Sequence, residues 1–273
     1  MKLSIKSTFP LNNGVSIPVL GLGTWDLRGR EAYHATLWAL QEGYRLIDTA
    51  TLYGNEVEIG DAIRKSGIPR EDIFLTTKVW DTDQGFDSTL TAFEKSLQRL
   101  RLKHVDLYLI HWPRRRRNET WMALEKIYQG GLARAIGVSN YTIKHLKELM
   151  DVSTTIPSVN QVEFSPFLYQ KELLEFCHAS HIIVEAYCPL TRATRLRHPQ
   201  LIAVGKRYGK SSAQVLLRWG LQHDVIQIPK SGNRNHIHEN SDIFDFELNE
   251  KDMTELDSLN ENLRVVDDSI LHG

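Results

Sequence analysis

The sequence predicts an α/β protein in which eight parallel strands close into a (β/α)8 barrel, a TIM barrel, preceded by an N-terminal β-hairpin. Eight short runs rich in leucine and β-branched residues alternate with longer segments of helical period along the whole chain. Such alternation indicates parallel pairing, because parallel strands need a crossover connection. No linker or low-complexity segment interrupts the series. We therefore expect residues 1–273 to form a single domain, a length that α/β barrels routinely reach.

The expected strands span residues 18–22, 46–48, 73–78, 105–111, 133–139, 159–163, 182–187 and 225–229. The expected helices span residues 31–42, 57–65, 88–102, 120–128, 143–150, 171–180 and 212–221. The clearest helical signal is the stripe formed by Leu90, Phe93, Leu97, Leu100 and Leu102, which repeats mostly at i, i+3 and i+4.

The N-terminal segment PLNNGVSIP places Asn13-Gly14 between two short runs, which predicts a hairpin that could plug the barrel floor. The alternative fold is an open, doubly wound sheet. That fold usually carries a GxGxxG phosphate loop after its first strand. The corresponding segment here reads GLGTW, at residues 21–25, so the closed barrel is favoured.

Composition excludes several classes of partner. Lys+Arg number 33 and Asp+Glu 34, for a net charge of -1, so no general cationic field exists to hold nucleic acid. The two cysteines are too few for a disulfide framework, and the chain opens on polar sequence instead of an apolar signal region. No apolar stretch approaches the roughly 20 residues that span a bilayer. We expect a cytoplasmic protein without membrane or nucleic-acid partners.

Ionisable residues end several of the expected strands. Asp48 ends the second strand, Lys78 the third and His111 the fourth, while Tyr53 follows Asp48 within LIDTATLYGNE. Taken singly, each is more often structural; an Asp after a strand commonly caps the next helix. The loops at the carboxyl ends of barrel strands, however, build the active site, so the four residues are expected on one face.

These four side chains suit proton transfer to a carbonyl oxygen. An ammonium at Lys78 lowers the pKa of Tyr53 from its usual value of about 10, and Asp48 keeps that ammonium charged and in place. His111 is expected to hydrogen-bond the oxygen that Tyr53 protonates. No protein side chain offers a hydride, so a nicotinamide would supply it. No metal is expected, because the histidines lack the close Cys or carboxylate partners of a zinc site.

The chain resembles the aldo-keto reductases along nearly its whole length. Eight motifs in order carry this resemblance: GLGTW, LIDTATLYGNE, TKVW, LYLIHWP, RAIGVSN, VNQVEFSPF, VEAYCPL and IPKSGN. The chain is most similar to the short microbial branch of this family, whose members reduce small dicarbonyls, keto sugars and aldehydes. The resemblance implies an NADPH-dependent reductase, by the family's habit a monomer, with Asp48, Tyr53, Lys78 and His111 as catalytic tetrad and Tyr53 as general acid.

The resemblance also implies a cofactor site. Ser139, Asn140 and Gln161 would hold the nicotinamide carboxamide, since a hydroxyl and two amides both donate and accept, and Tyr187 would stack on the ring. The remaining cofactor-binding residues implied are Gly23, Thr24, Asp48, Leu190, Lys230, Ser231, His236, Glu239 and Asn240.

Two positions depart from the family pattern. His236 stands where the family usually has an arginine, whose bidentate fork grips the 2′-phosphate of NADPH. Arg234, two residues earlier, is expected to compensate. NADPH is the expected cofactor, with NADH as an alternative. Cys188 stands where a serine is usual near the pyrophosphate and can serve through its backbone.

The substrate pocket is expected to be lined by Trp25, Trp80, Trp112 and His111, as an apolar slot that limits water. Loops after Pro113 and Leu190 and the tail at residues 263–273 look shorter than the family's, which predicts an open pocket and broad substrate tolerance.

Four consecutive arginines, Arg114, Arg115, Arg116 and Arg117, follow the fourth strand, and the next helix is expected to begin at Asn118 or Glu119. We interpret the run as a solvated loop. The alternative is that one or two of these arginines lean over the pocket and favour anionic carbonyl substrates.

Other classes of function stay open at this point. A barrel of this kind could bind the cofactor as a regulatory or structural protein, or could be a metal-dependent hydrolase, because fold does not fix function. The complete Asp, Tyr, Lys and His set favours the enzyme, since a pure binder needs no proton donor.

Overall fold

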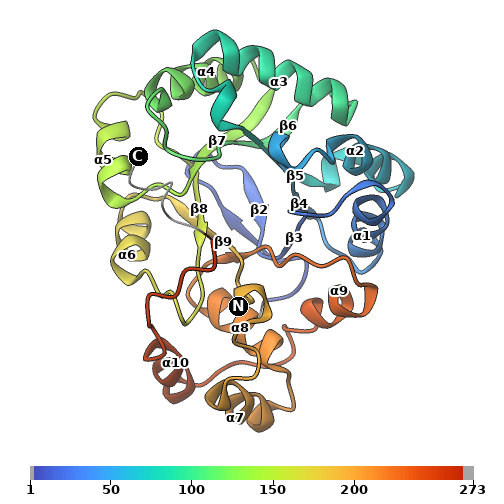
Figure 1. The fold of residues 1–273 in the computed structure, drawn as a ribbon, viewed down its shortest axis with the longest axis vertical. Coiled ribbons are helices and arrows are strands. Elements are labelled where there is room, and N and C mark those ends of the chain that lie inside the picture. Colours follow the sequence, from blue (N-terminus) through green and yellow to red (C-terminus); the bar gives the residue numbers. More distant parts are fainter. Residues whose placement is uncertain (1–2, 267–273) are drawn as a thin grey trace.

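Eight parallel strands form a closed barrel in the computed structural model, which describes residues 3–266. Neighbouring strands pair in chain order, and the bridges Leu20 to Gln227 and Gly23 to Lys230 join the last strand to the first. Figure 1 looks down on the resulting ring. The strands are β3 (Gly21–Gly23), β4 (Leu46–Asp48), β5 (Phe74–Val79), β6 (Val105–Ile110), β7 (Ala133–Ser139), β8 (Val159–Glu163), β9 (Ile183–Tyr187) and β10 (Ile226–Gln227). The predicted fold class is confirmed.

Helices surround the barrel and cover its outer face (Figure 1). They are α1 (Gly29–Gln41), α2 (Glu56–Lys65), α3 (Phe86–Leu100), α4 (Arg117–Gln129), α5 (Ile143–Met150), α6 (Lys171–Ala179), α7 (Pro199–Tyr208), α8 (Ser212–Gln222), α9 (Arg234–Ser241) and α10 (Glu250–Asp257). Two short 3-10 turns matter for the site, η1 (Thr51–Tyr53) and η4 (Thr191–Ala193).

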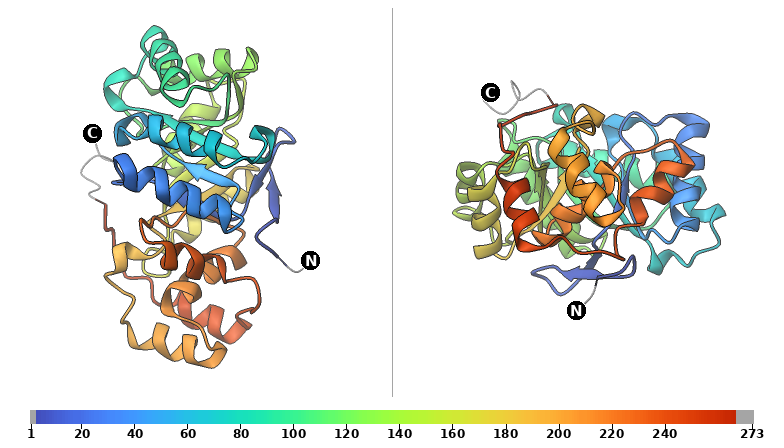
Figure 2. Two further views of the ribbon diagram at one scale, coloured as in Figure 1. Left: turned by 90° about the vertical axis from the view of Figure 1, so that its right-hand side faces the viewer. Right: turned by 90° about the horizontal axis from the view of Figure 1, so that it is seen from below.

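The N-terminal hairpin closes one end of the barrel, as predicted. Its strands, β1 (Thr8–Pro10) and β2 (Ser16–Pro18), pair antiparallel, and Figure 2 shows them at the end opposite the last described residues. Leu11 and Ile17 are buried and pack in one cluster with barrel-interior residues such as Leu107. The barrel is therefore a filled core instead of a channel.

Several element boundaries differ from the prediction. The first barrel strand begins at Gly21, because Pro18 belongs to β2. Helix α4 begins at Arg117, so the last arginine of the run is helical and not part of the loop. Helices α7, α9 and α10 were not expected. Helix α9 buries only Ile237 and Asn240, which leaves little hydrophobic periodicity to read from the sequence.

No helix within residues 3–266 is long and apolar enough to cross a membrane.

Candidate active site

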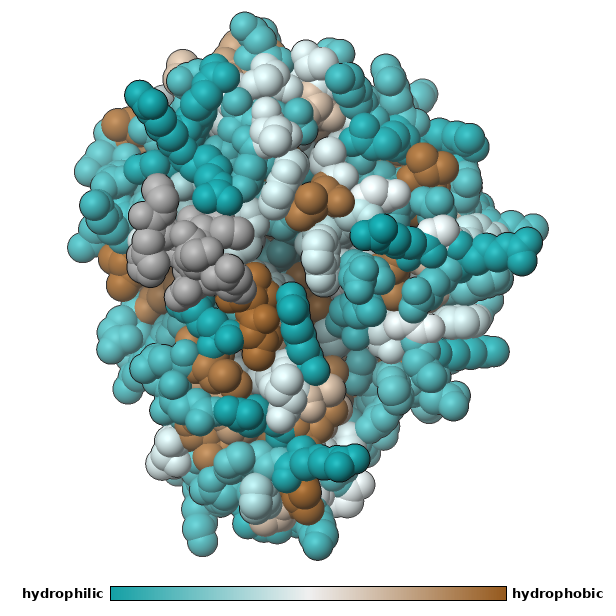
Figure 3. Space-filling view, in the orientation of Figure 1, coloured by the Kyte–Doolittle hydropathy of each residue, from teal (hydrophilic) through white to brown (hydrophobic). Residues whose placement is uncertain are grey.

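A cleft of about 950 Å³ opens at the carboxyl ends of the strands. Figure 3 shows hydrophobic residues gathered around a hollow near the centre of this face. All but two of the predicted site residues line the cleft: Gly23, Trp25, Asp48, Tyr53, Trp80, His111, Trp112, Ser139, Asn140, Gln161, Tyr187, Leu190, Lys230, Ser231, His236, Glu239 and Asn240. The two exceptions, Thr24 and Lys78, are fully buried behind its wall.

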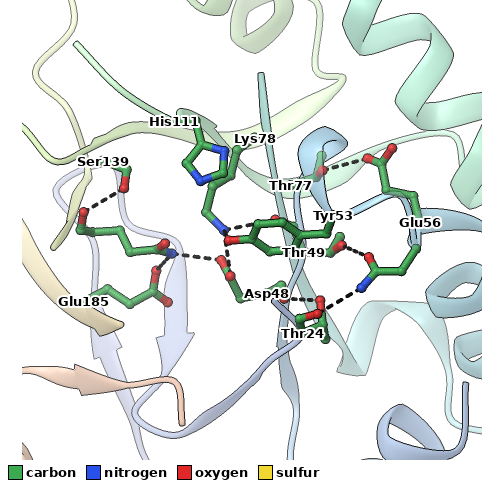
Figure 4. A network of polar contacts seen from close by, with 12 residues as sticks. Thr24, Asp48, Thr49, Tyr53, Glu56, Thr77, Lys78, His111, Ser139 and Glu185 are labelled. Carbon is green, nitrogen blue, oxygen red and sulfur yellow. Dashed lines mark hydrogen bonds and ion pairs between the residues drawn. The ribbon is translucent and has the colours of Figure 1, made fainter. Parts of the chain in front are cut away.

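Lys78 links the tetrad. From its place near the end of β5, its Nζ donates to Asp48 Oδ1 at 2.6 Å, to the Thr49 carbonyl at 3.1 Å and to Tyr53 Oη at 3.2 Å. Figure 4 shows these groups converging beside the ring of His111. Burial alone would lower the pKa of Lys78, but the charges of Asp48 and Tyr53 and their hydrogen bonds raise it overall. The ammonium therefore stays charged at neutral pH.

Tyr53 differs from the prediction in the net direction of its pKa shift. Burial raises the pKa of Tyr53 to about 12, and this outweighs the lowering by the Lys78 charge. The expected effect of Lys78 is present but smaller than the cost of burying a phenolate. The phenol thus holds its proton at neutral pH and becomes a donor when a stronger base forms next to it.

His111 is a neutral imidazole at this site. Burial lowers the pKa of His111 well below its ordinary value, and the Lys78 charge lowers it further. The ring meets Tyr53 edge to face at 5.7 Å between centroids, and Trp80 at 5.1 Å. Its buried Nδ1 has no hydrogen-bond partner within the described part of the chain. A neutral imidazole still carries one N–H to donate.

A buried amide holds the turn that presents Tyr53. Asn55 Nδ2 donates to the carbonyls of Thr24 and Leu27, both at 2.9 Å, and Asn55 Oδ1 accepts from Thr49 Oγ1 at 2.6 Å. Thr24, predicted to bind cofactor, instead donates its hydroxyl to the Asp48 carbonyl at 2.8 Å. Its side chain fixes the end of β4 and does not face the cleft.

The first residue of α2, Glu56, makes its own hydrogen bonds to neighbouring elements. Glu56 accepts from Thr77 Oγ1 at 2.7 Å (Figure 4). It also accepts from Arg99 Nε at 2.6 Å. This ties the helix that follows Tyr53 to both β5 and α3.

Ser139, Asn140 and Gln161 lie together, and their side-chain hydroxyl and N–H donors are already bonded to protein atoms; Ser139 Oγ donates to the Gln161 carbonyl at 2.8 Å. Asn140 Nδ2 donates to the His111 carbonyl at 3.0 Å and to Ser139 Oγ at 3.1 Å. Gln161 Nε2 donates to Asp48 Oδ2 at 2.8 Å and to Glu185 Oε2 at 2.6 Å. The free capacity of both amides is therefore on their oxygens, which suits the N–H groups of a primary carboxamide. This set of acceptor oxygens fits the carboxamide of the implied cofactor.

Tyr187 is fixed at the cleft by the same group. Its hydroxyl donates to Asn140 Oδ1 at 2.7 Å, and Asn140 itself adopts a left-handed backbone with φ of 63°. Asparagine tolerates that conformation better than most residues. The ring orientation of Tyr187 is therefore set before any ligand binds.

The predicted phosphate end of the site is less basic than expected. Lys230, Ser231 and His236 line the cleft, but Arg234, the first residue of α9, is exposed and is not among its lining residues. Asn233 caps this helix by accepting from the amides of residues 235 and 236. The expectation that Arg234 replaces a missing arginine is not supported by its position.

The arginine run does not reach the cleft. Arg114 pairs with Asp81 at 2.6 Å, Arg116 with Glu119 at 2.6 Å, and Arg117 with Glu148 at 2.8 Å. None of the four arginines lines the cleft. The interpretation as a surface run agrees with these contacts, whereas the idea that some lean over the substrate does not.

The sequence did not single out several residues that the structure brings to the site. Glu185 is fully buried beneath Gln161, and it lies in an apolar strand pattern that gave no signal beyond one charged residue in a buried run. Arg192, Leu196 and the first residues of α8 also line the cleft. Arg192 and Leu196 precede α7, in a segment for which the sequence predicted no helix, whereas α8 was predicted as a helix but not as part of the site.

A closed barrel with a lysine-linked tyrosine at its mouth defines an oxidoreductase that acts on carbonyl groups. The sequence profile of the Aldo/keto reductase family matches residues 19–261, and the chain belongs to this family. It is 49% identical over 267 residues to the glyoxal reductase of Bacillus subtilis, with 97% of both chains covered. The predictions of the family and of an NAD(P)H-dependent oxidoreductase are confirmed.

Solved structures of the family have the same fold. An aldo-keto reductase from a Medee basin deep-sea metagenome library superposes with a TM-score of 0.93 at 42% identity, covering 95% of this chain and 97% of that one. A Bombyx mori aldo-keto reductase in complex with NADP superposes with a TM-score of 0.92 at 35% identity, covering 96% of this chain and 95% of that one.

Proposed function

We propose that this protein reduces small aldehydes, ketones, dicarbonyls and keto sugars to alcohols with NADPH, and that Tyr53 donates the proton. The observation that carries the proposal is the hydrogen-bonded chain from Asp48 through Lys78 to Tyr53 Oη, at 2.6 and 3.2 Å, in the wall of an apolar cleft. A buried ammonium held against a phenol stabilises the phenolate that proton donation would leave behind, which supports this role for Tyr53.

The side chains support the reaction as follows. When bound, the nicotinamide would supply a hydride to the carbonyl carbon. As negative charge grows on the carbonyl oxygen, Tyr53 donates its proton there, and Lys78 stabilises the developing phenolate at 3.2 Å. Asp48 balances the ammonium charge before and after the transfer. The neutral His111 donates its N–H to the same oxygen and so orients the carbonyl.

The walls of the cleft keep water from the reacting groups. Trp112 is buried, and Trp80 packs against His111, while Trp25 meets the Tyr53 ring at 5.1 Å and is 44% exposed. Trp25 is thus the exposed edge of an otherwise buried apolar slot, which fits small carbonyl compounds of varied shape. The glyoxal reductase among the relatives is consistent with small dicarbonyl substrates.

We assign NADPH as cofactor on the residues that line the cleft. The Ser139, Asn140 and Gln161 oxygens would hold the carboxamide, Tyr187 would stack on the ring, and Lys230 and Ser231 would meet the 2′-phosphate. Complexes of family members with NADP and NADPH support this choice. We further propose that the chain acts as a single-domain monomer.

Replacing Tyr53 by Phe tests the proposal. The variant keeps the ring but loses the proton, so we expect kcat for a carbonyl such as glyoxal to fall by about 10²- to 10⁴-fold. NADPH binding, measured by fluorescence titration, should be retained. Tyr33→Phe on α1, outside the cleft, is the matched control. Equal turnover by Tyr53→Phe and the wild type would refute the proton-donor role.

A further inference from the structure

The segment that follows α10 returns to the mouth of the barrel. We call residues 260–266 the tail segment; Figure 1 shows it running from α10 to the carboxyl ends of β8 and β9. Its first half is tied to the loop after β8. The backbone amides of Glu261 and Leu263 donate to the Phe167 carbonyl at 3.2 and 2.9 Å, and Asn260 Oδ1 accepts from the Tyr169 amide at 3.1 Å.

The second half is held by one side chain. Glu163, the last residue of β8, is 3% exposed, and its two carboxylate oxygens accept from successive backbone amides. Val265 N lies 2.7 Å from Oε1 and Val266 N lies 3.1 Å from Oε2. Burial raises the pKa of Glu163, while these two amide hydrogen bonds act in the opposite direction because they favour the carboxylate form. Both contacts are shorter than the 3.3 Å contact of Arg264 with Gln170, the other side-chain tie at this end of the tail segment.

A weaker second tie supports the same arrangement. Gln170 Nε2 donates to the Glu163 carbonyl at 2.7 Å, and Gln170 Oε1 accepts from Arg264 at 3.3 Å. The position matters because Val266 lines the cleft. Glu163 also stands two residues after Gln161 on β8, so alternation places both side chains on one face of the strand. Strand β8 thus carries both Gln161, which lines the cleft, and Glu163, which holds Val266 at the cleft rim.

We propose that Glu163 is a latch that fixes the tail segment at the cleft edge and thereby sets the largest carbonyl substrate the cleft accepts. This inference rests on the proposed function for its kinetic consequence. Loss of the latch leaves residues 260–263 bound to the loop after β8 but frees residues 265 and 266. The rim opens at Val266, and bulky carbonyls gain access while small ones are unaffected.

Limited proteolysis measures whether Glu163 holds the tail segment in place, and it does so independently of carbonyl reduction. Trypsin cleaves after Arg264, between the two halves of the tail segment, and mass spectrometry follows release of the peptide that begins at Val265. Glu163→Ala should be cleaved about tenfold faster than the wild type, because a locally freed segment is cut in proportion to its open population. Glu163→Gln keeps the shape and one acceptor oxygen, and should be intermediate.

A matched control is available on the other side of the barrel. Glu125 on α4 also accepts from two successive backbone amides, those of Thr154 and Thr155 at 3.1 and 2.9 Å, and does not line the cleft. Glu125→Ala should leave cleavage after Arg264 unchanged. Its thermal unfolding, compared with that of the Glu163 variants, separates local release from loss of the fold.

Steady-state kinetics then test the consequence. We expect the ratio of kcat/KM for a bulky aromatic aldehyde to that for glyoxal to rise by about tenfold in Glu163→Ala, with Glu163→Gln between it and the wild type. Unchanged cleavage after Arg264 in Glu163→Ala would overturn the latch. Faster cleavage with an unchanged ratio would overturn its role in substrate size. A wild type that reduced no carbonyl would refute the proposed function, while the proteolysis would still decide whether Glu163 holds the tail segment.

Discussion

Gln161 brings two buried carboxyl groups within reach of one amide nitrogen. Asp48 is paired with Lys78, but Glu185 has no cation, and its second oxygen is buried without a partner within the described residues. Burial raises the pKa of Glu185 to about 8, and the nearby charge of Asp48 contributes to the rise. Glu185 is therefore protonated at neutral pH, and a single negative charge faces the single ammonium.

Glu185 should make stability depend on pH. Its pKa rises from 4.5 to about 8 on folding, so the folded protein binds the proton more tightly. The stabilising contribution is complete below about pH 4.5, declines as pH rises between the two values, and is lost above about pH 8. In the Glu185→Gln variant the side chain is an amide, which does not ionise in this pH range. We expect this variant to gain on the order of a few kcal/mol over the wild type between about pH 5 and about pH 9.

Urea unfolding at several pH values measures this difference. The quantity to follow is the free energy of unfolding of Glu185→Gln minus that of the wild type, because other titrating groups cancel in the subtraction. A difference that stayed constant across the range would show that Glu185 does not titrate there.

His236 should weaken the preference for NADPH. It is exposed at the cleft edge, and an imidazole cannot provide the two-pronged contact with phosphate that arginine makes. His236→Arg should raise kcat/KM with NADPH by about tenfold relative to NADH, a value typical of one charge-assisted contact. Initial rates with each cofactor at saturating carbonyl check this, and Arg234→Ala, outside the cleft, is the control. An unchanged preference for NADPH over NADH would mean that the 2′-phosphate does not bind next to residue 236.

At the scale of elements, prediction succeeded where burial imposed a pattern. Strands β7 and β8 have the predicted bounds because both are buried runs, apart from the exposed Arg134 in β7, and both end at polar residues. Helix α9 could not be predicted in this way. Its first turn is fixed by the Asn233 cap and its sequence is almost entirely polar, so local capping and not periodicity decides where it begins.

The loop between β6 and α4 shows that a run of charged residues does not by itself predict a ligand-binding site. Four adjacent arginines suggest a site for anions, but Arg114 and Arg117 pair with carboxylates on other elements, Asp81 after β5 and Glu148 on α5. Arg116 lies over Gly85, where a β-carbon would stand 2.3 Å from its guanidinium carbon. The run therefore braces the outer wall of the barrel.

Replacing the four arginines at residues 114–117 by serine should leave substrate charge preference unchanged. The ratio of kcat/KM for a keto acid to that for its uncharged ketone analogue is the measurement, since none of the four lines the cleft. Stability should fall, because the buried end of Asp81 loses its partner. A fall in the ratio would instead show that an arginine reaches the bound substrate.

At the scale of the whole molecule, the two ends of the barrel have different tasks. The mouth carries the tetrad and the cleft, and the floor carries the hairpin and its packing, which is the usual division in barrels of this kind. The tetrad could be predicted because strand ends and motifs mark it in the sequence. Glu185 and the Glu163 contact could not, because each depends on residues distant in the chain that only the closed barrel brings together.

This division predicts that stability can be changed at the floor without changing catalysis. Ile17 in β2 is fully buried in the cluster that fills the barrel interior. Ile17→Ala removes apolar contacts and leaves a cavity, so the free energy of unfolding should fall by about 2 to 5 kcal/mol. The carbonyl reductase kcat at 25 °C should stay within about twofold of the wild type, since no tetrad residue belongs to that cluster. Denaturant unfolding and steady-state rates on the same preparation measure both. A loss of kcat comparable to that of Tyr53→Phe, in a variant still folded, would mean that the hairpin end helps to position the tetrad through the barrel core.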